Sequence, residues 1–456
     1  MNLSTHSRRS FLQRGAATAA AGLAAPALIS PLANRAFAAP SEQVVVGSIG
    51  LGGQGNGIMR RASRFGPVAA VCDVDANRRQ RGPKDAARYE DYRKVLDHKD
   101  IDVITIGTPD HWHTKIAIDA MRAGKDVYCE KPLTLTIDEC RQILKVLEET
   151  GRVLQVGTQQ RSGANTFLKA IAMVRDGRVG KVKKLTVCVN RNPYSDAIAE
   201  APVPKELNWE LWQGQTPLVP YRKESGVKHF PQVKGGGDGG GTASNCHYEF
   251  RWWLQYSGGK MTDWGAHHVD SAQWMIEQVG PDQGPLSIEP VKVEQAVDFD
   301  EQGNPVQTDR YNVPKMFEVK AVFPDDIEMI ITSDGRNGIL VEGTEARLFV
   351  NRGGVNGTPV EELSSNPLPE DAIEKVYGGP LNSHMGNFMD CVKTRKRPVA
   401  DARSHCPALA TCHLSNIALR LNRKIQWDAK AKQVVGDPVA NSMLAREQRK
   451  GYEIDV

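Results

Sequence analysis

Closely spaced cysteine pairs are missing from this chain. None of its eight cysteines lies in a Cys-x-x-Cys pattern, and several stand in apolar runs that are typical of strands or helices. Zinc sites and disulfide-rich domains depend on such spacing. We therefore expect mostly buried thiols, with neither a disulfide framework nor a zinc site.

An excess of positive charge is also missing beyond residue 38. The formal net charge is +4, and Arg8, Arg9, Arg14 and Arg35 account for it, because residues 1–38 contain no Asp or Glu. A protein that binds nucleic acid needs a basic surface against the phosphates. No nucleic-acid partner is therefore expected.

The chain has no apolar run long enough to cross a membrane. The run from Gly15 to Leu28 is shorter than the roughly 20 residues that a spanning helix needs. It follows Ser7-Arg8-Arg9-Ser10-Phe11-Leu12 and precedes Ala36-Phe37-Ala38, a pattern that resembles a twin-arginine signal peptide with its cleavage site. We predict that residues 1–38 direct export of the folded protein, for example to the periplasm. A membrane anchor is the less favoured alternative.

Short apolar runs alternate with amphipathic, helix-like stretches between residues 42 and 160. The runs are Val44 to Ile49, Pro67 to Cys72, Val103 to Ile106, Asp126 to Cys129 and Val153 to Val156. This alternation predicts an α/β domain, a doubly wound parallel sheet of the Rossmann type.

The pattern changes after residue 160 to alternation with a period of two. It begins at residues 183–190 and returns at 291–296, 316–323, 327–332 and 346–350. We predict an α+β domain over residues 161–430, built on a mostly antiparallel, open-faced sheet, and a tail at 431–456. An uncovered sheet face suits a partner subunit, so a homo-oligomer is expected.

Residues 191–259 form a long insertion in this second domain. It contains Trp209, Trp212, Trp252 and Trp253 and the run Gly235 to Gly241. Long insertions are usually lids or connectors, and these aromatic residues suit a packed lid. The glycine run lacks the Lys-Ser/Thr of a phosphate loop, so we interpret it as a hinge.

A Gly-x-Gly-x-x-Gly pattern, formed by Gly50, Gly52 and Gly55, follows the first predicted strand. Such glycines let the backbone approach a pyrophosphate at the start of the next helix. Asp73 ends the second strand and is placed to accept hydrogen bonds from ribose hydroxyls, which favours NAD. Arg78 and Arg79 suit a 2′-phosphate, which leaves NADP as the alternative.

The next two strands lead into Thr108-Pro109-Asp110-His111-Trp112-His113 and Tyr128-Cys129-Glu130-Lys131-Pro132-Leu133. Ligands of doubly wound sheets gather at the carboxyl ends of the strands, where both segments fall. Lys131 would then lie near the nicotinamide. A partly desolvated lysine beside a cationic ring is able to take part in removing a hydroxyl proton, whereas the alternative is a surface lysine paired with Glu130.

These segments, followed later by Asp263-x-x-x-His267, resemble the Gfo/Idh/MocA oxidoreductases, the family of glucose-fructose oxidoreductase and inositol dehydrogenase. The resemblance covers residues 42 to about 430, and the segment from Pro204 to Trp212 resembles the exported branch. It implies an NAD(P)-dependent enzyme that transfers hydride between its nicotinamide cofactor, held tightly, and a hydroxyl of a sugar or polyol.

The resemblance also implies roles for single residues. His267 would be the general acid/base, Asp263 would orient the substrate, and Lys131 would bind and polarise the reacting oxygen. Asp263 and His267 are four residues apart, so on one helix they would share a face. Which of Lys131 and His267 takes the proton stays open. Thr108, Glu130, Lys131 and His113 are expected beside the cofactor, and Gln159 has a counterpart there.

Several histidines permit a second interpretation. His111 with His113, and His267 with His268, have the spacing of metal ligands, but no carboxylate-rich cluster accompanies them and hydride transfer needs no metal, so none is expected. We expect His268 to face the protein. His384 starts a predicted helix and is expected either to cap it or to reach the site.

Two other functions stay open. One is an NAD-dependent glycosidase that oxidises a ring carbon transiently and eliminates the leaving group. The other is a sugar-binding protein that has lost catalysis. The presence of Lys131, Asp263 and His267 together favours a dehydrogenase, or a sugar oxidoreductase that recycles its bound cofactor.

Overall fold

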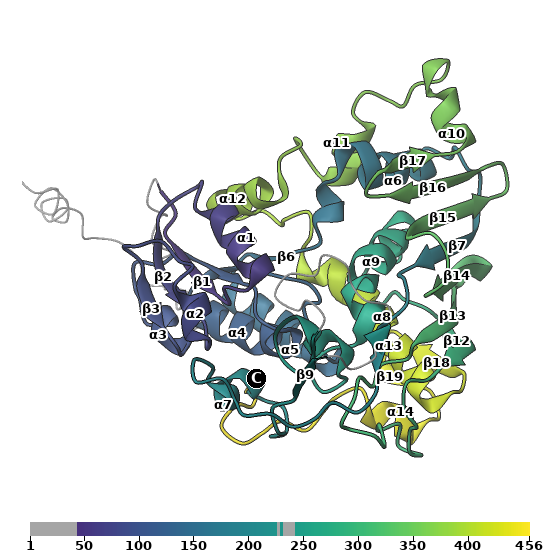
Figure 1. The fold of residues 1–456 in the computed structure, drawn as a ribbon. Helices are drawn as coiled ribbons and strands as arrows, with labels where there is room; N and C mark the ends of the chain where they lie inside the picture. Colours follow the sequence, from purple (N-terminus) through teal and green to yellow (C-terminus); the bar gives the residue numbers. More distant parts are fainter. Residues whose placement is uncertain (1–42, 226–228, 231–241) are drawn as a thin grey trace, which may run out of the picture. The chain divides into compact units, whose positions relative to one another are not determined.

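A computed structural model describes residues 43–225, 229–230 and 242–456 (Figure 1). The predicted signal peptide and the run Gly235 to Gly241 lie outside the described residues. Within the described part of the chain, no helix combines the length and the apolar character needed to span a bilayer. All eight cysteines are buried free thiols, as predicted.

The first part of the chain forms a six-stranded parallel sheet with strand order β3-β2-β1-β4-β5-β6. Its strands are β1 (Val46–Ile49), β2 (Val68–Cys72), β3 (Ala87–Tyr89), β4 (Val103–Ile106), β5 (Asp126–Cys129) and β6 (Leu154–Val156). The helices between them are α1 (Gly53–Ala62), α2 (Ala76–Arg79), α3 (Arg93–Leu96), α4 (Asp110–Arg122) and α5 (Ile137–Thr150). Strands β1, β4 and β5 are buried along their whole length, as expected for a sheet covered on both faces. The predicted Rossmann fold is confirmed.

Strand β3 is absent from the sequence prediction. It has only three residues, each partly exposed, at the edge of the sheet, so it lacks the apolar run that marks the other strands. Helix α1 starts at Gly53, inside the glycine-rich turn.

The second sheet has nine strands in the order β17-β16-β15-β7-β14-β13-β12-β18-β19. The strands are β7 (Val182–Cys188), β12 (Ser287–Glu294), β13 (Met316–Phe323), β14 (Ile327–Thr332), β15 (Gly338–Gly343), β16 (Arg347–Asn351), β17 (Gly354–Asn356), β18 (Ile425–Asp428) and β19 (Gln433–Val434). Neighbouring strands are antiparallel except for β7 and β14, which are parallel. The predicted mostly antiparallel sheet is confirmed.

The two faces of this sheet differ in burial. In one row across the strands, Val319, Ile331, Val187 and Ile339 are fully buried. Figure 1 shows α9 (Gly265–Met275) and α13 (Ala402–Leu421) on one side of these strands. The next row carries partly exposed side chains on the opposite face, because successive residues of a strand point to opposite sides.

The insertion builds a small apolar core of its own. Its elements are β8 (Tyr194–Ser195), α7 (Trp209–Gln213), β9 (Lys223–Ser225), β10 (His229–Phe230), β11 (Thr242–Ser244) and the 3₁₀ helix η4 (His247–Trp252). The four tryptophans named above are buried in or beside this core. The insertion also crosses onto the first sheet, where the Asn208 amide donates to the Val74 carbonyl at 3.0 Å and the Ala76 amide donates to Glu206 at 2.9 Å.

The remaining helices lie between and after these strands. They are η2 (Gln159–Ser162), η3 (Ala164–Leu168), α6 (Lys169–Arg175), α8 (Gly259–Asp263), η5 (Pro324–Asp326), α10 (Thr358–Glu361), η6 (Glu362–Ser364), α11 (Ala372–Tyr377), α12 (His384–Thr394) and α14 (Pro438–Ser442). Met385, Phe388 and Met389 of α12 pack in one cluster with Val46 and Leu51 of the first sheet. The domain boundaries given above stay predictions.

Candidate active site

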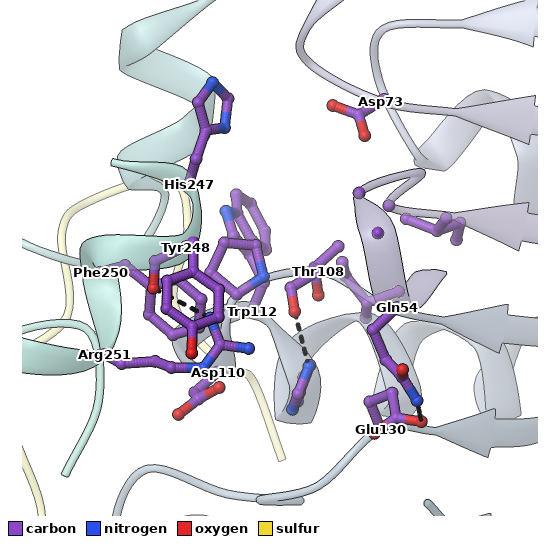
Figure 2. Close-up of a pocket in the computed structure, with 18 of the residues that line it drawn as sticks. Gln54, Asp73, Thr108, Asp110, Trp112, Glu130, His247, Tyr248, Phe250 and Arg251 are labelled. Carbon is purple, nitrogen blue, oxygen red and sulfur yellow. Dashed lines mark hydrogen bonds between the residues drawn. The ribbon is translucent and has the colours of Figure 1, made fainter. Parts of the chain in front are cut away.

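One cavity of about 480 Å³ contains most of the residues predicted from the sequence. It is lined by the ends of strands in the first sheet, by η4 of the insertion and by α8 and α9. Figure 2 shows the η4 residues on one side and Asp73, Gln54 and Glu130 on the other. The predicted residues that line it are Gly50, Gly52, Asp73, Thr108, His113, Glu130, Lys131, Asp263 and His267.

The glycine-rich turn is pulled tight against the neighbouring strand. Gly50 has a φ of +81°, and a Cβ there would lie 2.6 Å from the Thr108 amide nitrogen. At Gly55, which does not line the cavity itself, a Cβ would lie 1.8 Å from the Gly50 carbonyl oxygen. Only glycine fits these two positions, and the turn leaves the start of α1 open to a pyrophosphate.

Asp73 stands where the prediction places it, at the end of β2. Its carboxylate accepts hydrogen bonds from the Leu51 amide at 2.7 Å and the Asp75 amide at 2.9 Å. Burial raises its pKa, although these bonds oppose the shift. Arg78 also lines the cavity and pairs with Asp75 at 3.5 Å. Arg79 is not part of the cavity lining and pairs with Glu90 at 3.8 Å.

The far end of the cleft fits an amide-bearing ring. The Thr108 hydroxyl is buried and has no hydrogen-bond partner among the described residues, so it is left to a ligand. Glu130 accepts from Gln54 Nε2 at 2.8 Å and from Gln159 Nε2 at 3.1 Å, and all three side chains line the cavity. The turn, Asp73 and this polar end together suit a nicotinamide dinucleotide.

His113 lines the cavity, and its place beside the cofactor stays a prediction. Its Nδ1 lies 2.7 Å from the Pro132 carbonyl oxygen and its Nε2 lies 2.9 Å from the Thr108 carbonyl oxygen. Both ring nitrogens are therefore engaged by the backbone. Burial lowers the pKa of the ring. His113 holds the segment that carries Lys131 against the end of β4.

Lys131 and Asp263 form a close ion pair in the cavity. Lys131 Nζ donates to Asp263 Oδ1 at 2.5 Å and to the Asp263 carbonyl at 3.1 Å. Arg251 and Lys260 also face this carboxylate, at 3.5 and 3.7 Å. Burial opposes ionisation, but these three cations together hold the pKa of Asp263 far below its usual range. Asp263 thus holds Lys131 and Arg251 in place. Its role in orienting a substrate stays a prediction.

His267 and Asp263 do not share one helix. Helix α8 ends at Asp263, α9 begins at Gly265, and Trp264 lies at the junction. Both side chains nevertheless line the same cavity. Burial, followed by the charges of Lys131 and Arg352, lowers the pKa of His267, so its imidazole is neutral near pH 7. Its Nδ1 is buried without a partner among the described residues.

Asp110, Arg251 and Arg352 line the cavity but were given no role from the sequence. Asp110 Oδ2 accepts from Ser257 Oγ at 2.5 Å, and Figure 2 shows Arg251 reaching toward Asp110. Burial raises the pKa of Asp110 to about 7. The Thr-Pro-Asp-His-Trp-His segment contains Asp110, but its partners lie far along the chain and have no local signal.

The other histidines lie away from the reacting groups. His268 Nε2 contacts Asn337 Oδ1 at 2.9 Å, so it faces the protein as predicted. His384 does not line the cavity; its ring lies 2.8 Å from Ser162 Oγ and 2.9 Å from the Val156 carbonyl. Ser383, not His384, caps α12. Among the described residues, no group of three His, Cys, Asp or Glu side chains is placed to hold a metal ion.

Aromatic side chains contribute to the lining of the cavity. Tyr248 and Phe250 come from η4, Trp264 from the α8–α9 junction, and Trp112 from α4. Trp252 and Trp253 are fully buried packing residues. The aromatic residues of the insertion therefore divide between packing and the cavity lining.

Two family descriptions match this chain. Residues 42–158 match the oxidoreductase family with an NAD-binding Rossmann fold, and residues 193–454, more than half of the chain, match the C-terminal alpha/beta domain of the same family. The chain belongs to the Gfo/Idh/MocA oxidoreductase family. This confirms the predicted family, fold class and NAD-binding first domain.

The chain is similar to curated proteins with two kinds of name. It is 32% identical over 155 residues to a glycosyl hydrolase family 109 protein of Shewanella pealeana, covering 31% of this chain and 34% of that protein. It is 29% identical over 143 residues to an inositol 2-dehydrogenase of Salmonella paratyphi B, covering 30% and 42%. The matched segments thus span less than half of either relative.

Solved structures share the fold. The WlbA dehydrogenase of Bordetella pertussis, solved with NADH and UDP-GlcNAcA, has a TM-score of 0.56 and 15% sequence identity. The match covers 84% of this chain and 99% of that one. At this identity the likeness shows the fold alone.

Proposed function

We propose that the protein oxidises a hydroxyl of a sugar or polyol by hydride transfer to NAD. The observation that carries this proposal is that Lys131, Asp263 and His267 line the same cavity as the glycine-rich turn and Asp73. The cavity therefore joins a dinucleotide cleft to a cluster of proton-handling groups. Its aromatic lining suits the apolar faces of a sugar ring.

The reaction divides between hydride and proton. When held by the glycine-rich turn and Asp73, a nicotinamide would supply the acceptor for the hydride that leaves the hydroxyl-bearing carbon. Lys131, held in place by Asp263, binds and polarises the hydroxyl oxygen. His267 has its pKa lowered by burial and neighbouring cations, so it is neutral and able to accept the hydroxyl proton. We thus assign the base to His267 and the stabilising charge to Lys131.

Substitution of these two residues tests the assignment. Lys131→Met and His267→Gln are expected to retain NAD and to lose at least about 100-fold in turnover, because each removes a group acting on the reacting oxygen. Lys115→Met is the matched control, since Lys115 pairs with Asp119 on α4 and does not line the cavity. Normal turnover in both variants contradicts the assignment. If the purified protein neither contains nor binds a nicotinamide, it is a non-catalytic sugar-binding member.

We also propose that NAD is held tightly and recycled by a second substrate. The insertion supports this: Asn208 and Glu206 pair with the backbone beyond β2, and His247 lies 3.4 Å from Asp75, so the insertion crosses the cleft near Asp73. Nucleotide released by denaturing the gel-filtered protein is expected to be NAD in near-equal amount to protein. NADP instead would assign Arg78 to a 2′-phosphate.

A glycosidase is the second candidate function. The similarity to the Shewanella pealeana protein, named a glycosyl hydrolase, favours it. In such a reaction the cofactor returns to its starting state within each cycle, so glycoside cleavage proceeds without net NADH. Accumulation of NADH with an unglycosylated polyol supports the dehydrogenase; release of a leaving group from an aryl glycoside without NADH supports the glycosidase.

We further propose that residues 1–38 export the protein. The paired Arg8 and Arg9, the apolar run and the Ala36-Phe37-Ala38 site support this. Fused to a folded fluorescent protein, residues 1–38 are expected to send it to the periplasm. Arg8→Lys with Arg9→Lys should block transport and Arg14→Lys should not. Equal transport of all three fusions contradicts the proposal.

A further inference from the structure

The reacting end of the cavity has more positive than negative charge. Lys131, Arg251 and Lys260 lie within 3.7 Å of the single carboxylate of Asp263. Asp110, the next carboxyl group, faces Arg251 and has its pKa raised to about 7 by burial, so it is only partly ionised at neutral pH. The cluster around Asp263 therefore keeps an excess of cations.

Arg352 adds to this excess from a different element. It stands at the tip of the β16–β17 hairpin, lines the cavity, and places its guanidinium 4.7 Å from the centre of the Trp264 ring. Among the described residues no carboxylate lies within ion-pairing distance of it. Arg352 and His267 line the same cavity, and the charge of Arg352 helps to lower the pKa of His267.

Among the described residues, Glu130 forms no ion pair with Arg352. Its carboxylate accepts from the side chains of Gln54 and Gln159, on the cofactor side of the cavity. An exposed guanidinium held on an aromatic ring is able to bind an anion that meets its planar donors. A neutral sugar supplies no such anion.

We propose that the substrate is an anionic sugar or polyol, one that carries a carboxylate or a phosphate, and that Arg352 binds this group. The inference rests on the proposed function, because it concerns the substrate of the same site. Arg251 and Lys260 supply background charge, while Arg352 lines the cavity without an ion-pair partner among the described residues. The sugar ring then packs against the neighbouring Trp264, beside His267.

The test compares acidic sugars with their neutral parents in the NAD-loaded full chain. Glucose, glucuronate, gluconate, glucose 6-phosphate, myo-inositol and inositol 1-phosphate are assayed for NADH formation and titrated calorimetrically for binding. An acidic member is expected to exceed its neutral parent at least about 10-fold in kcat/KM and in affinity. A response to glucuronate or gluconate indicates a carboxylate as the bound group. A response to glucose 6-phosphate or inositol 1-phosphate indicates a phosphate.

Variants assign the effect to Arg352. Arg352→Gln is expected to weaken binding and kcat/KM for the acidic sugar about 10- to 100-fold, as for loss of a charge-assisted hydrogen bond, and to change the binding of the neutral parent much less. Arg352→Lys should restore part of the loss. Arg336→Gln is the matched control, since Arg336 stacks on Phe349 at 4.5 Å outside the cavity.

Two results overturn this proposal: neutral parents that bind and react as well as the acids, or an Arg352→Gln variant that weakens both classes equally. The outcome is separable from the proposed function. If only neutral sugars are turned over, the anionic substrate is ruled out and the oxidoreductase function stands. If acidic sugars bind in an Arg352-dependent way but no NADH forms, the oxidoreductase function is ruled out and the anion site stands.

Discussion

Asp263 is the residue on which the charges of the site depend. Lys131, Arg251 and Lys260 all face its carboxylate, and its side chain is only 12% exposed. Removing one partner of a buried ion pair leaves the other charges uncompensated, which costs about 3–5 kcal/mol. We therefore expect Asp263→Asn to lower the free energy of unfolding by about that amount, measured by denaturant titration.

An exposed carboxylate provides the control for Asp263. Asp334 pairs with Arg191 at 2.9 Å, with side chains 65% and 46% exposed. Such surface pairs contribute about 0–1 kcal/mol, so Asp334→Asn should have little effect. Equal, small losses in the two variants would show that the cations around Asp263 are not held by it.

Asp110 gives the site a dependence on pH. Burial raises its pKa to about 7, whereas a carboxyl of the unfolded chain titrates near 3.9. A raised pKa means that the folded state binds the proton more tightly. This contribution to stability is therefore fully present below about pH 4 and is lost as the pH rises through 7.

Asp110→Asn removes this titration. The stability of the wild-type protein relative to the variant is expected to fall between pH 5 and pH 8, because only the wild type must ionise a buried group. Unfolding free energies of both proteins at the two pH values measure the change. A difference between them that does not vary with pH contradicts the raised pKa.

At this scale the sequence predicts the groups that lie in local motifs. Lys131, Asp263 and His267 all line the cavity, as do Asp73 and Thr108. The contacts of Asp110 were not predictable, since Ser257 is 147 residues away. The sequence also does not show which atoms a ring faces, so the engagement of His113 by two carbonyls was missed.

At the scale of elements, the insertion combines a predictable and an unpredictable property. Its tryptophans predicted a packed segment, and it does have its own apolar core. Its contact with the first sheet runs through backbone groups at Glu206 and Asn208, which any residue type provides. The junction at Trp264 was missed for a related reason: helical spacing continues across it although the helix does not.

His247 tests whether the insertion holds the cofactor. It lines the cavity and lies 3.4 Å from Asp75 beside the cleft. We expect His247→Ala to speed NADH release a few-fold, as for loss of one partly exposed contact, measured by stopped-flow fluorescence. His98→Ala, at a pair with Asp100 that does not line this cavity, should leave the rate unchanged. Identical release rates in both variants contradict a role for the insertion in retaining NAD.

At the scale of the whole molecule, one face of the nine-stranded sheet carries partly exposed side chains. Ile330, Leu340 and Phe349 lie in one row across its strands, linked through Thr186, and are partly exposed. We propose that this face joins two copies of the chain. Ile330→Glu is then expected to halve the mass measured by light scattering, because it buries a charge in the interface. An unchanged mass contradicts this face as the interface.

The transfer of a labelled hydrogen tests the central claim most directly. The NAD-loaded protein is given a sugar or polyol that carries deuterium on the carbon of its reacting hydroxyl, and the nicotinamide is analysed by mass spectrometry. The account predicts deuterium on the nicotinamide, in amounts that depend on both Lys131 and His267. A nicotinamide that stays unlabelled while substrate is converted would contradict it.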